Sequence, residues 1–275
     1  MSMKKWLLGV LAAAAVIGTV TGCGSSPSAS SAAPSAKSKI TVGVTPGPYE
    51  QIMEAVTKEA AKEGLTVHVK TFSDYVTPDQ ALANGDIDLN AYQHEPFLDN
   101  FNEKNGTHLV SIGKTILSPL GVYSRKYKTA EQIPDGATIA IPNDPTNGGR
   151  ALQLLASKGW IQLKSGLGSK ATVADITSNP KQIKIIELEA AQLPRSLDDT
   201  DASVINGNYA LNAGLNSQKD ALFAESKDSP YVNIIASRPE DKDNPAYQKF
   251  VKAWQSDSVK KFIDDTFNGA FIAAW

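Results

Sequence analysis

Residues 39–275 alternate between β-branched runs and segments whose apolar side chains fall on one helical face. Residues 40–44 form the first β-branched run, and Pro48 opens a segment in which apolar residues recur every three or four positions until Gly64. The first pattern is typical of a buried strand and the second of an amphipathic helix. Repeated strand and helix units predict the α/β class, in which sheets are sandwiched by helices.

The same pattern continues to the end of the chain. Further strands are predicted at residues 65–69, 87–89, 109–112, 120–124, 138–141, 183–188, 202–205 and 232–236, and further helices at 78–84, 96–105, 147–158, 246–254 and 259–267. A stretch of roughly 237 residues is long for one hydrophobic core and comfortable for two lobes of ~100 residues each.

The N-terminal stretch has the composition of an export signal. Lys4 and Lys5 precede an apolar run over residues 6–20, and residues 21–23 read Thr-Gly-Cys. This run of roughly 15 apolar residues is shorter than the roughly 20 that a membrane-spanning helix needs. We therefore predict a signal peptide over residues 1–22.

Cys23 is the only cysteine in the chain. A lone thiol is awkward in an oxidising compartment unless it has a use, and its place after Thr-Gly resembles a lipobox. That resemblance implies cleavage before Cys23 and a thioether-linked diacylglycerol (palmitate-type lipidation) on its sulfur. The alternative is an ordinary signal peptide that happens to hold a cysteine. We expect a protein of the cell membrane, held only by a lipid anchor on the extracytoplasmic face.

The residues after the cysteine predict a tether. Residues 24–38 are mostly serine and alanine and contain no large apolar side chain, so they cannot offset the entropy cost of ordering. Residues 23–38 are therefore predicted to be a lipidated cysteine followed by a flexible linker. The 27 basic residues less the two of the signal leave 25 against 29 acidic ones, a net charge near −4. Without a basic stripe, the sequence argues against a nucleic-acid partner.

Two predicted strands are each followed by a turn that carries aromatic side chains, which we call an aromatic corner. Tyr92 and His94 lie between the strand at 87–89 and the helix at 96–105, and Phe72 and Tyr75 follow the strand at 65–69. These side chains offer flat apolar surfaces with polar edges, suited to clamping a thioether at about 0.3–1.5 kcal/mol per sulfur-to-ring contact. The alternative for Tyr92 and His94 is a helix-capping turn with a buried tyrosine, and the residues alone do not decide between the two.

A third segment, residues 141–152, runs from a strand through a tight turn into a helix. Thr146 or Asn147 can cap this helix, whose free N–H groups then form a natural anion site. Arg150, one turn further, adds a guanidinium suited to a carboxylate. The alternative is an arginine salt-bridged on a helix surface. The glycines do not have the spacing of a phosphate-binding loop.

Asparagines end or open two further strands. Asn206 follows the strand at 202–205, and Asn233 lies in the strand at 232–236. Either side chain can accept a hydrogen bond from an ammonium group, although asparagine is also common in plain turns. An exported α/β protein with such groups at strand ends suggests a solute receptor, because these sheets bind ligands at the carboxyl ends of their strands.

Other classes of protein have less support. The chain has three histidines and none of the common hydrolase or zinc-protease motifs, so we predict no catalytic residue, although a tethered extracellular enzyme stays an alternative. Asp198, Asp199 and Asp201 lack the spacing of a calcium loop and are predicted to be solvated turn carboxylates. We expect no metal and no cofactor. A surface adhesin, which would expose a large apolar patch, is a third class.

These segments together resemble the methionine-binding lipoprotein family of ABC importers. The resemblance covers residues 40–275 and is carried by residues 85–94, 141–150, 187–199, 229–233 and 267–269. It implies a two-lobed type II periplasmic-binding-protein fold, each lobe a mixed, mostly parallel sheet flanked by helices. It places lobe one at residues 39–124 plus 232–275 and lobe two at residues 125–231.

The resemblance also implies roles for single residues. Arg150 would hold the ligand carboxylate with Asn147 beside it, and Asn206 and Asn233 would take the α-amino end. The side chain of the ligand would be surrounded by Tyr75, Tyr92, His94 and Phe72. The implied ligand is L-methionine, with D-methionine, a methionine-containing dipeptide of the Gly-Met type or another small apolar amino acid as alternatives. Residues 117–119, Leu-Ser-Pro, lack an aromatic that some family members carry before this proline, which leaves the side-chain end of the pocket roomier.

The implied partners are an ABC permease with its cytoplasmic ATPase, and the protein is expected to be a monomer. Its mechanism would be ligand capture in the cleft between the lobes, coupled to lobe closure.

Overall fold

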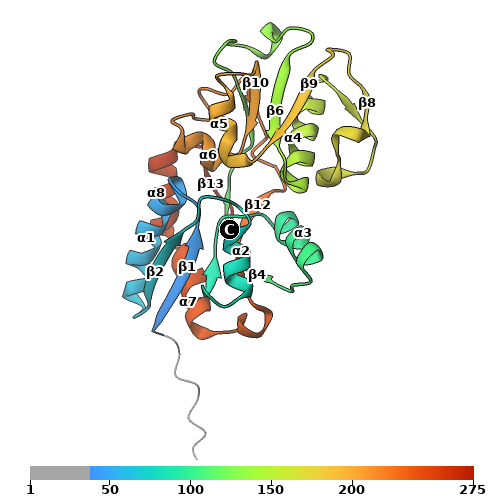
Figure 1. Cartoon of the computed structure of the whole chain (residues 1–275). Helices are drawn as coiled ribbons and strands as arrows, with labels where there is room; N and C mark the ends of the chain where they lie inside the picture. The colour runs from blue at the N-terminus through green and yellow to red at the C-terminus, as the bar shows by residue number, and fades with distance from the viewer. Residues whose placement is uncertain (1–37) are drawn as a thin grey trace, which may run out of the picture. The chain divides into compact units, whose positions relative to one another are not determined.

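The structure is a computed structural model that describes residues 38–275. The predicted signal peptide, Cys23 and the linker up to residue 37 lie outside the described residues. Within them the chain forms two main sheets, each with helices on both faces (Figure 1). No helix in residues 38–275 has the length and apolar character needed to cross a membrane.

The first sheet has six strands in the order β13-β4-β12-β3-β1-β2. Its strands are β1 (Lys39–Val44), β2 (Thr66–Thr71), β3 (Leu89–Asn90), β4 (Val110–Leu117), β12 (Val232–Ser237) and β13 (Ile272–Ala273). One cluster of buried side chains includes α1 (Pro48–Lys62), α7 (Pro245–Trp254) and α8 (Asp257–Phe267), and another includes α2 (Thr77–Ala83) and α3 (Glu95–Asn105). The six-stranded sheet is thus covered on both faces (Figure 1).

The second sheet has five strands in the order β11-β5-β10-β6-β9. Its strands are β5 (Gly121–Tyr123), β6 (Thr138–Pro142), β9 (Lys184–Leu188), β10 (Ala202–Ile205) and β11 (Phe223–Ala224). Helix α4 (Pro145–Ser157) belongs to one of its buried clusters, and α5 (Leu193–Ser196) and α6 (Gly207–Asn212) belong to the other. A two-stranded ribbon of β7 (Gln162–Leu163) and β8 (Ile176–Ser178) follows α4.

Both sheets are mixed, and the expectation that they are mostly parallel is wrong. Parallel pairing is confined to β2-β1-β3 and β9-β6-β10. All pairs that involve β4, β5, β11, β12 or β13 are antiparallel. The chain leaves the six-stranded sheet where β4 leads to β5 and returns to it where β11 leads to β12. The outgoing and returning strands that pair, β4 with β12 and β5 with β11, therefore run in opposite directions.

The chain crosses from the first sheet to the second earlier than we predicted, and strand β5 belongs to the second sheet. We predicted that residues 121–123 belong to lobe one, which was to end at Ser124. Strand β5 instead pairs antiparallel with β10 and β11 of the five-stranded sheet. The chain therefore leaves the six-stranded sheet at residues 118–120, before β5, and returns to it at β12.

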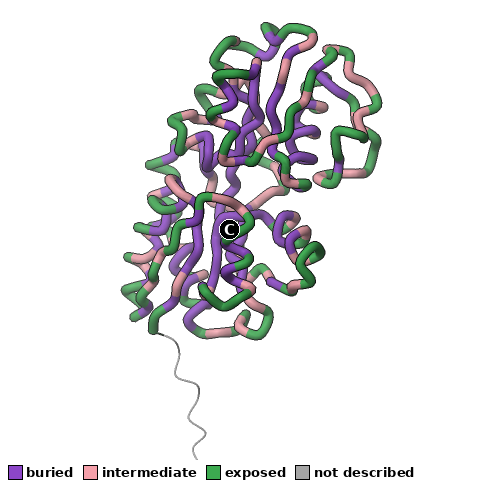
Figure 2. The backbone as a smooth tube through the Cα atoms, viewed as in Figure 1, coloured by how far each residue is buried: buried purple, intermediate pink, exposed green. Residues whose placement is uncertain are grey.

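The hydrophobic cores explain why these segments fold as they do. The buried side chains of α1 are spaced three or four residues apart, at Tyr49, Ile52, Met53, Val56 and Ala60. They pack with β1 and with Phe250 and Trp254 of α7. The inner strands β1, β6, β10 and β12 are largely buried, whereas the edge strands β2 and β9 and the outer helix faces are partly or fully exposed (Figure 2). Every predicted strand and helix overlaps an observed one, whereas α5, α6 and the two-residue strands β7, β11 and β13 were not predicted.

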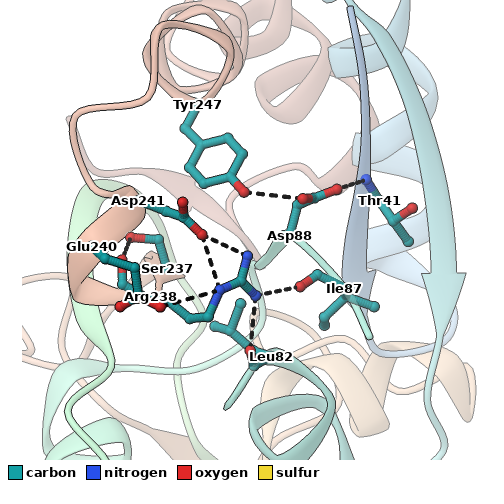
Figure 3. A network of polar contacts seen from close by, with 9 residues as sticks. All are labelled: Thr41, Leu82, Ile87, Asp88, Ser237, Arg238, Glu240, Asp241 and Tyr247. Carbon is teal, nitrogen blue, oxygen red and sulfur yellow. Dashed lines mark hydrogen bonds and ion pairs between the residues drawn. The ribbon is translucent and has the colours of Figure 1, made fainter. Parts of the chain in front are cut away.

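A buried polar network ties the C-terminal segment to the first strands (Figure 3). The guanidinium of Arg238 donates to the backbone oxygens of Leu82 and Ile87 at 2.9 and 2.8 Å, and to Asp241 at 2.9 and 2.7 Å. Asp88 accepts from the backbone N–H of Thr41 at 2.8 Å and from the hydroxyl of Tyr247 at 3.0 Å. These hydrogen bonds hold the segment after β12 against the end of α2, the loop before β3 and the strand β1.

Candidate functional site

A cavity lies between the two sheets. Its lining comes from loops and helix starts that follow β2, β3 and β4 of one sheet and β6 and β10 of the other, together with the start of the antiparallel β12. The lining residues are Tyr75, Tyr92, Gln93, His94, Phe97, Ser118, Asn147, Arg150, Asn206, Asn208 and Asn233. This is the edge where α/β sheets bind ligands.

His94 is both the N-cap of α3 and part of the cavity wall. Its Nδ1 accepts from the backbone N–H of Phe97 at 3.2 Å, and its Nε2 lies 3.2 Å from Asn147 Oδ1. Burial, with Arg150 nearby, lowers the pKa of His94 to about 3. The imidazole is therefore neutral at physiological pH, with its proton on Nε2 because Nδ1 acts as an acceptor.

Asn147 connects the two sides of the cavity. It lies in the first turn of α4, and its backbone N–H and its side-chain amide both donate to Asp144, at 2.9 and 3.0 Å. Asp144 is the N-cap of this helix, so the prediction that Thr146 or Asn147 caps it is wrong. The Oδ1 atom of Asn147 accepts from His94 of the six-stranded side and from Asn206 Nδ2 of the five-stranded side, the latter at 2.9 Å. Asn147 is thus fully hydrogen-bonded and acts as a fixed bridge.

Three aromatic rings form an apolar wall. The ring centroids of Tyr75 and Tyr92 lie 5.8 Å apart, and Phe97 lies 6.0 Å from Tyr75 and 6.3 Å from Tyr92 in edge-on contacts. The hydroxyl of Tyr75 donates to Asn208 Oδ1 across the cavity at 2.6 Å. This wall suits an aliphatic or thioether group, which gains from contact with ring edges and faces.

A buried carboxyl stands behind this wall. Asp79 is fully buried and accepts from Asn90 at 2.7 Å and from Gln93 at 2.6 Å. Burial raises the pKa of Asp79 to about 6 in spite of these hydrogen bonds. The hydroxyl of Tyr92 lies 3.1 Å from Asp79 and 2.5 Å from the backbone oxygen of Tyr75. Since Tyr92 has one hydroxyl proton, both contacts are satisfied when Asp79 is protonated.

Arg150 is held on several sides. Its Nε and Nη2 donate to the two carboxylate oxygens of Glu225 at 2.6 and 2.5 Å, and Nη2 also donates to the backbone oxygen of Ser118 at 3.0 Å. The ring of Tyr231 lies 4.6 Å from the guanidinium carbon. The arginine is therefore not salt-bridged on a helix surface, but the fork expected to face a ligand is already engaged by Glu225.

Three buried polar atoms of the cavity lining have no hydrogen-bond partner among residues 38–275. They are Gln93 Oε1, Ser118 Oγ and Asn206 Oδ1. Buried polar groups are nearly always paired, so atoms of this kind indicate where a polar ligand or water binds. Two of the three are acceptors, and the serine hydroxyl can donate.

Asn233 is fixed at the start of β12. Its amide nitrogen donates to the hydroxyl of Tyr49 and, at 3.2 Å, to the backbone oxygen of Tyr92. It also forms an isolated bridge with His94. These contacts position Asn233 beside the aromatic corner predicted from the sequence.

Seven of the eight predicted ligand-binding residues line this one cavity: Tyr75, Tyr92, His94, Asn147, Arg150, Asn206 and Asn233. Phe72 does not line it. Its ring is buried instead in a core cluster with Leu82 of α2 and Leu98 of α3.

The sequence analysis did not single out five residues that the structure brings to the site. Gln93, Phe97, Ser118 and Asn208 line the cavity, and Glu225 pairs with Arg150. The first four lie within or next to segments already marked by their neighbours, which was the available signal. Glu225 had no local signal, because its partner is 75 positions away.

A second cavity adjoins the first beyond the aromatic wall. It shares Tyr75 and Phe97 with the first cavity, and its other side chains include Asp144, Glu189 and Tyr209. Residues from both sheets line this second cavity as well. Phe97 lies on α3, which packs on the six-stranded sheet, and Tyr209 lies on α6, which packs on the five-stranded sheet. The wall therefore separates two adjacent spaces between the sheets.

Comparison with known proteins agrees with this architecture. A solved structure of a nutrient binding protein from Burkholderia cenocepacia bound to methionine is 51% identical, with a TM-score of 0.84 over 86% of this chain and 100% of that chain. A crystal structure of the methionine binding protein MetQ is 48% identical, with a TM-score of 0.85 over 86% and 98% of the two chains. The fold is that of a two-lobed type II periplasmic-binding protein.

The sequence comparisons define the family. The family described as NlpA lipoprotein matches residues 40–275. The D-methionine-binding lipoprotein MetQ of Yersinia pestis is 46% identical over 271 residues, 97% of each chain, and that of Escherichia coli K12 is 48% identical over 239 residues, 86% of this chain and 88% of that protein. This chain belongs to the NlpA lipoprotein family.

Proposed function

We propose that this protein is the substrate-binding lipoprotein of an ABC importer and that it captures methionine in the cavity between its two sheets. The methionine-bound relative from Burkholderia cenocepacia supports this most directly. The lining supports it too, because it combines a guanidinium, unpaired polar atoms and an aromatic wall. These are the groups that a small zwitterion with an apolar side chain needs.

We assign each end of the ligand to a part of the cavity. The carboxylate binds Arg150 and the hydroxyl of Ser118, whose Oγ has no partner among the described residues. The ammonium group donates to Asn206 Oδ1, with Asn233 beside it. The thioether contacts Tyr75, Tyr92 and Phe97, with sulfur-to-ring contacts of about 0.3–1.5 kcal/mol each. The neutral His94 and Asn147 hold the two sides together.

The function is binding, with no chemical turnover. We propose one lobe for each sheet, with crossings at residues 118–120 and 225–231. The protein would be a monomer, anchored through a lipid on Cys23 at the extracytoplasmic face of the membrane. Closure of the lobes around the ligand would create the surface that the permease, with its cytoplasmic ATPase, recognises.

The second cavity favours one alternative ligand class. A methionine-containing dipeptide needs more space than methionine, and the adjacent cavity lies directly beyond Tyr75 and Phe97. If these rings move apart, a longer ligand fits without a change of fold.

The experiment is calorimetric titration of the purified protein, unfolded and refolded to remove carried ligand, with L-methionine, D-methionine, Gly-Met and leucine in parallel. Micromolar or tighter binding of a methionine isomer, about −8 kcal/mol or more favourable, is the expected result. Preference for Gly-Met would support the alternative ligand class, and heat signals from none of the four would contradict the proposed function.

A further inference from the structure

Glu225 is the counterion of the group that we assign to the ligand carboxylate. The carboxylate of Glu225 contacts both Nε and Nη2 of Arg150, at 2.6 and 2.5 Å. Both side chains are almost fully removed from solvent, with exposed fractions of 4% for Arg150 and 10% for Glu225. A charge pair with this little solvent screening acts on any charged group placed beside it.

The pair leaves a defined part of the guanidinium free. An arginine side chain has five N–H donors, one on Nε and two on each terminal nitrogen. The Nε donor and both Nη2 donors of Arg150 are taken by Glu225 and by the backbone oxygen of Ser118. Only Nη1 has no partner among residues 38–275, so it is the nitrogen available to a ligand.

Glu225 is itself fixed by the crossing between the sheets. Its backbone N–H donates to the oxygen of Leu120 at 2.9 Å, and its Oε2 accepts from the N–H of Leu120 at 3.0 Å. Ser118, which holds Nη2 of Arg150, lies in the same crossing. The carboxylate of Glu225 therefore cannot swing away when a ligand enters without breaking this backbone pairing.

The other charged group near Arg150 has its own partners. Asp144 caps α4 and accepts from Asn147 and Thr146, at the positive end of that helix. His94 is neutral, as described above. Glu225 is thus the group that balances the charge of Arg150 inside the site.

We propose that Glu225 determines the charge selectivity of the cavity. It occupies the Nε and Nη2 edge of Arg150 and cancels the arginine charge, so the cavity prefers ligands that bring a carboxylate together with an ammonium group over monoanions that bring the carboxylate alone. This proposal rests on the proposed function, because it assumes that Arg150 receives the ligand carboxylate. In a zwitterion, the attraction of the ammonium group to Glu225 offsets the repulsion between Glu225 and the ligand carboxylate, whereas a monoanion has this repulsion without the compensating attraction.

The test compares three ligands of similar shape and different net charge. They are L-methionine, which is neutral overall, 4-(methylthio)butanoate, which lacks the ammonium group, and L-methioninamide, which lacks the carboxylate. Their affinities are measured for the wild type and for Glu225→Gln by calorimetric titration or competition at pH 6. Relative to methionine, we expect Glu225→Gln to strengthen butanoate binding about tenfold and to weaken methioninamide binding.

The comparison separates selectivity from damage to the fold. A change in the position of Arg150 alters the two carboxylate ligands together, so their affinity ratio reports the charge of Glu225. Glu187→Gln, at an exposed carboxyl on β9, is the matched control and should leave all three affinities unchanged. Equal changes for all three ligands in Glu225→Gln, or no changes, would overturn the proposal.

Two further measurements cover the remaining outcomes. Glu225→Ala and Glu225→Met make the same charge change with other shapes, in case the glutamine variant does not fold. The chain has only four arginines, so ¹⁵N-arginine spectra of the wild type should show slowly exchanging Nε–H signals for Arg150 and Arg238. Absence of the Arg150 signal would overturn the ion pair itself.

Failure of the wild type to bind any of the three ligands would instead count against the proposed function.

Discussion

At the scale of single residues, the site depends on side chains whose charge is set by burial. His94 is kept neutral with its Nε2 proton facing Asn147, and Asp79 has a pKa raised to about 6 behind the aromatic wall. Hydrogen bonds from Asn90 and Gln93 favour the ionised form of Asp79, but burial outweighs them. Asp79 therefore positions Gln93 and Tyr92, which face the cavity.

The raised pKa of Asp79 makes stability depend on pH. The folded state holds a proton on this carboxyl over a range where the unfolded chain has lost it, so the free energy of unfolding falls as pH rises from about 4 to about 6 or 7. Asp79→Asn removes this effect, since the amide can donate to Tyr92 as the protonated acid does. From pH 4 to pH 7, we expect its stability relative to the wild type to rise by roughly 2 kcal/mol, measured by urea unfolding.

The control for this prediction is Asp86→Asn, which changes an exposed carboxyl on the loop before β3. Its unfolding free energy should stay within about 0.5 kcal/mol of the wild type across the same pH range. Parallel stability curves for Asp79→Asn and the wild type from pH 4 to pH 7 would show that Asp79 titrates normally.

At the scale of elements, the loops of the site are held by segments from far along the chain. Helix α2 ends at Ala83 without a basic residue in its last turn. Arg238, which follows β12, donates from its guanidinium to the backbone oxygens of Leu82 and Ile87 (Figure 3). The end of α2 and the approach to β3 are thereby tied to the C-terminal segment.

Arg238→Ala should therefore destabilise the fold. The change leaves two buried backbone oxygens and Asp241 without their charged donor, which is expected to cost about 2–4 kcal/mol in urea unfolding. Arg238→Lys should recover only part of this, because an ammonium group cannot match the planar fork. Arg195→Ala, at an exposed position on α5, is the control. A loss below 0.5 kcal/mol for Arg238→Ala would refute the capping role.

Most long elements could be predicted from the sequence because their signals are local. The apolar spacing of α1 and the β-branched run of β10 each carry their own pattern, whereas α4 begins at Pro145, two residues before its predicted start. Two-residue strands such as β11 and β13 have no such pattern, since they are defined by pairing with distant partners. The direction of the strands next to the crossings likewise depends on which distant strands pair.

The candidate site was predictable to a similar degree. The turns that follow predicted strands pointed to Tyr92, His94, Asn147 and Arg150, which line the cavity. They could be predicted because the carboxyl ends of strands lie together at one edge of a sheet. The partner of Arg150 could not be predicted, since Glu225 lies in a turn that only the antiparallel pairing of β11 brings close. Phe72 was misplaced because an aromatic residue after a strand fits a core as well as a pocket.

At the scale of the whole folded region, side chains from the two sheets meet across the cavity. Tyr75 donates to Asn208 at 2.6 Å, Tyr209 donates to the backbone oxygen of Ser73 at 3.0 Å, and His94 lies 3.2 Å from Asn147. A ligand that contacts both sides adds to these bridges and favours the arrangement in which the two sides meet, by its differential affinity. Binding and closure are in this account one equilibrium.

The most direct test of this account is a crystal structure with L-selenomethionine added to protein that contains ordinary methionine. Anomalous scattering then locates the ligand selenium without any assumption about its pose. The account predicts one selenium peak beside the rings of Tyr75, Tyr92 and Phe97, with the ligand carboxylate at Nη1 of Arg150. A peak outside this cavity, or a carboxylate that displaces Glu225 from Arg150, would contradict it.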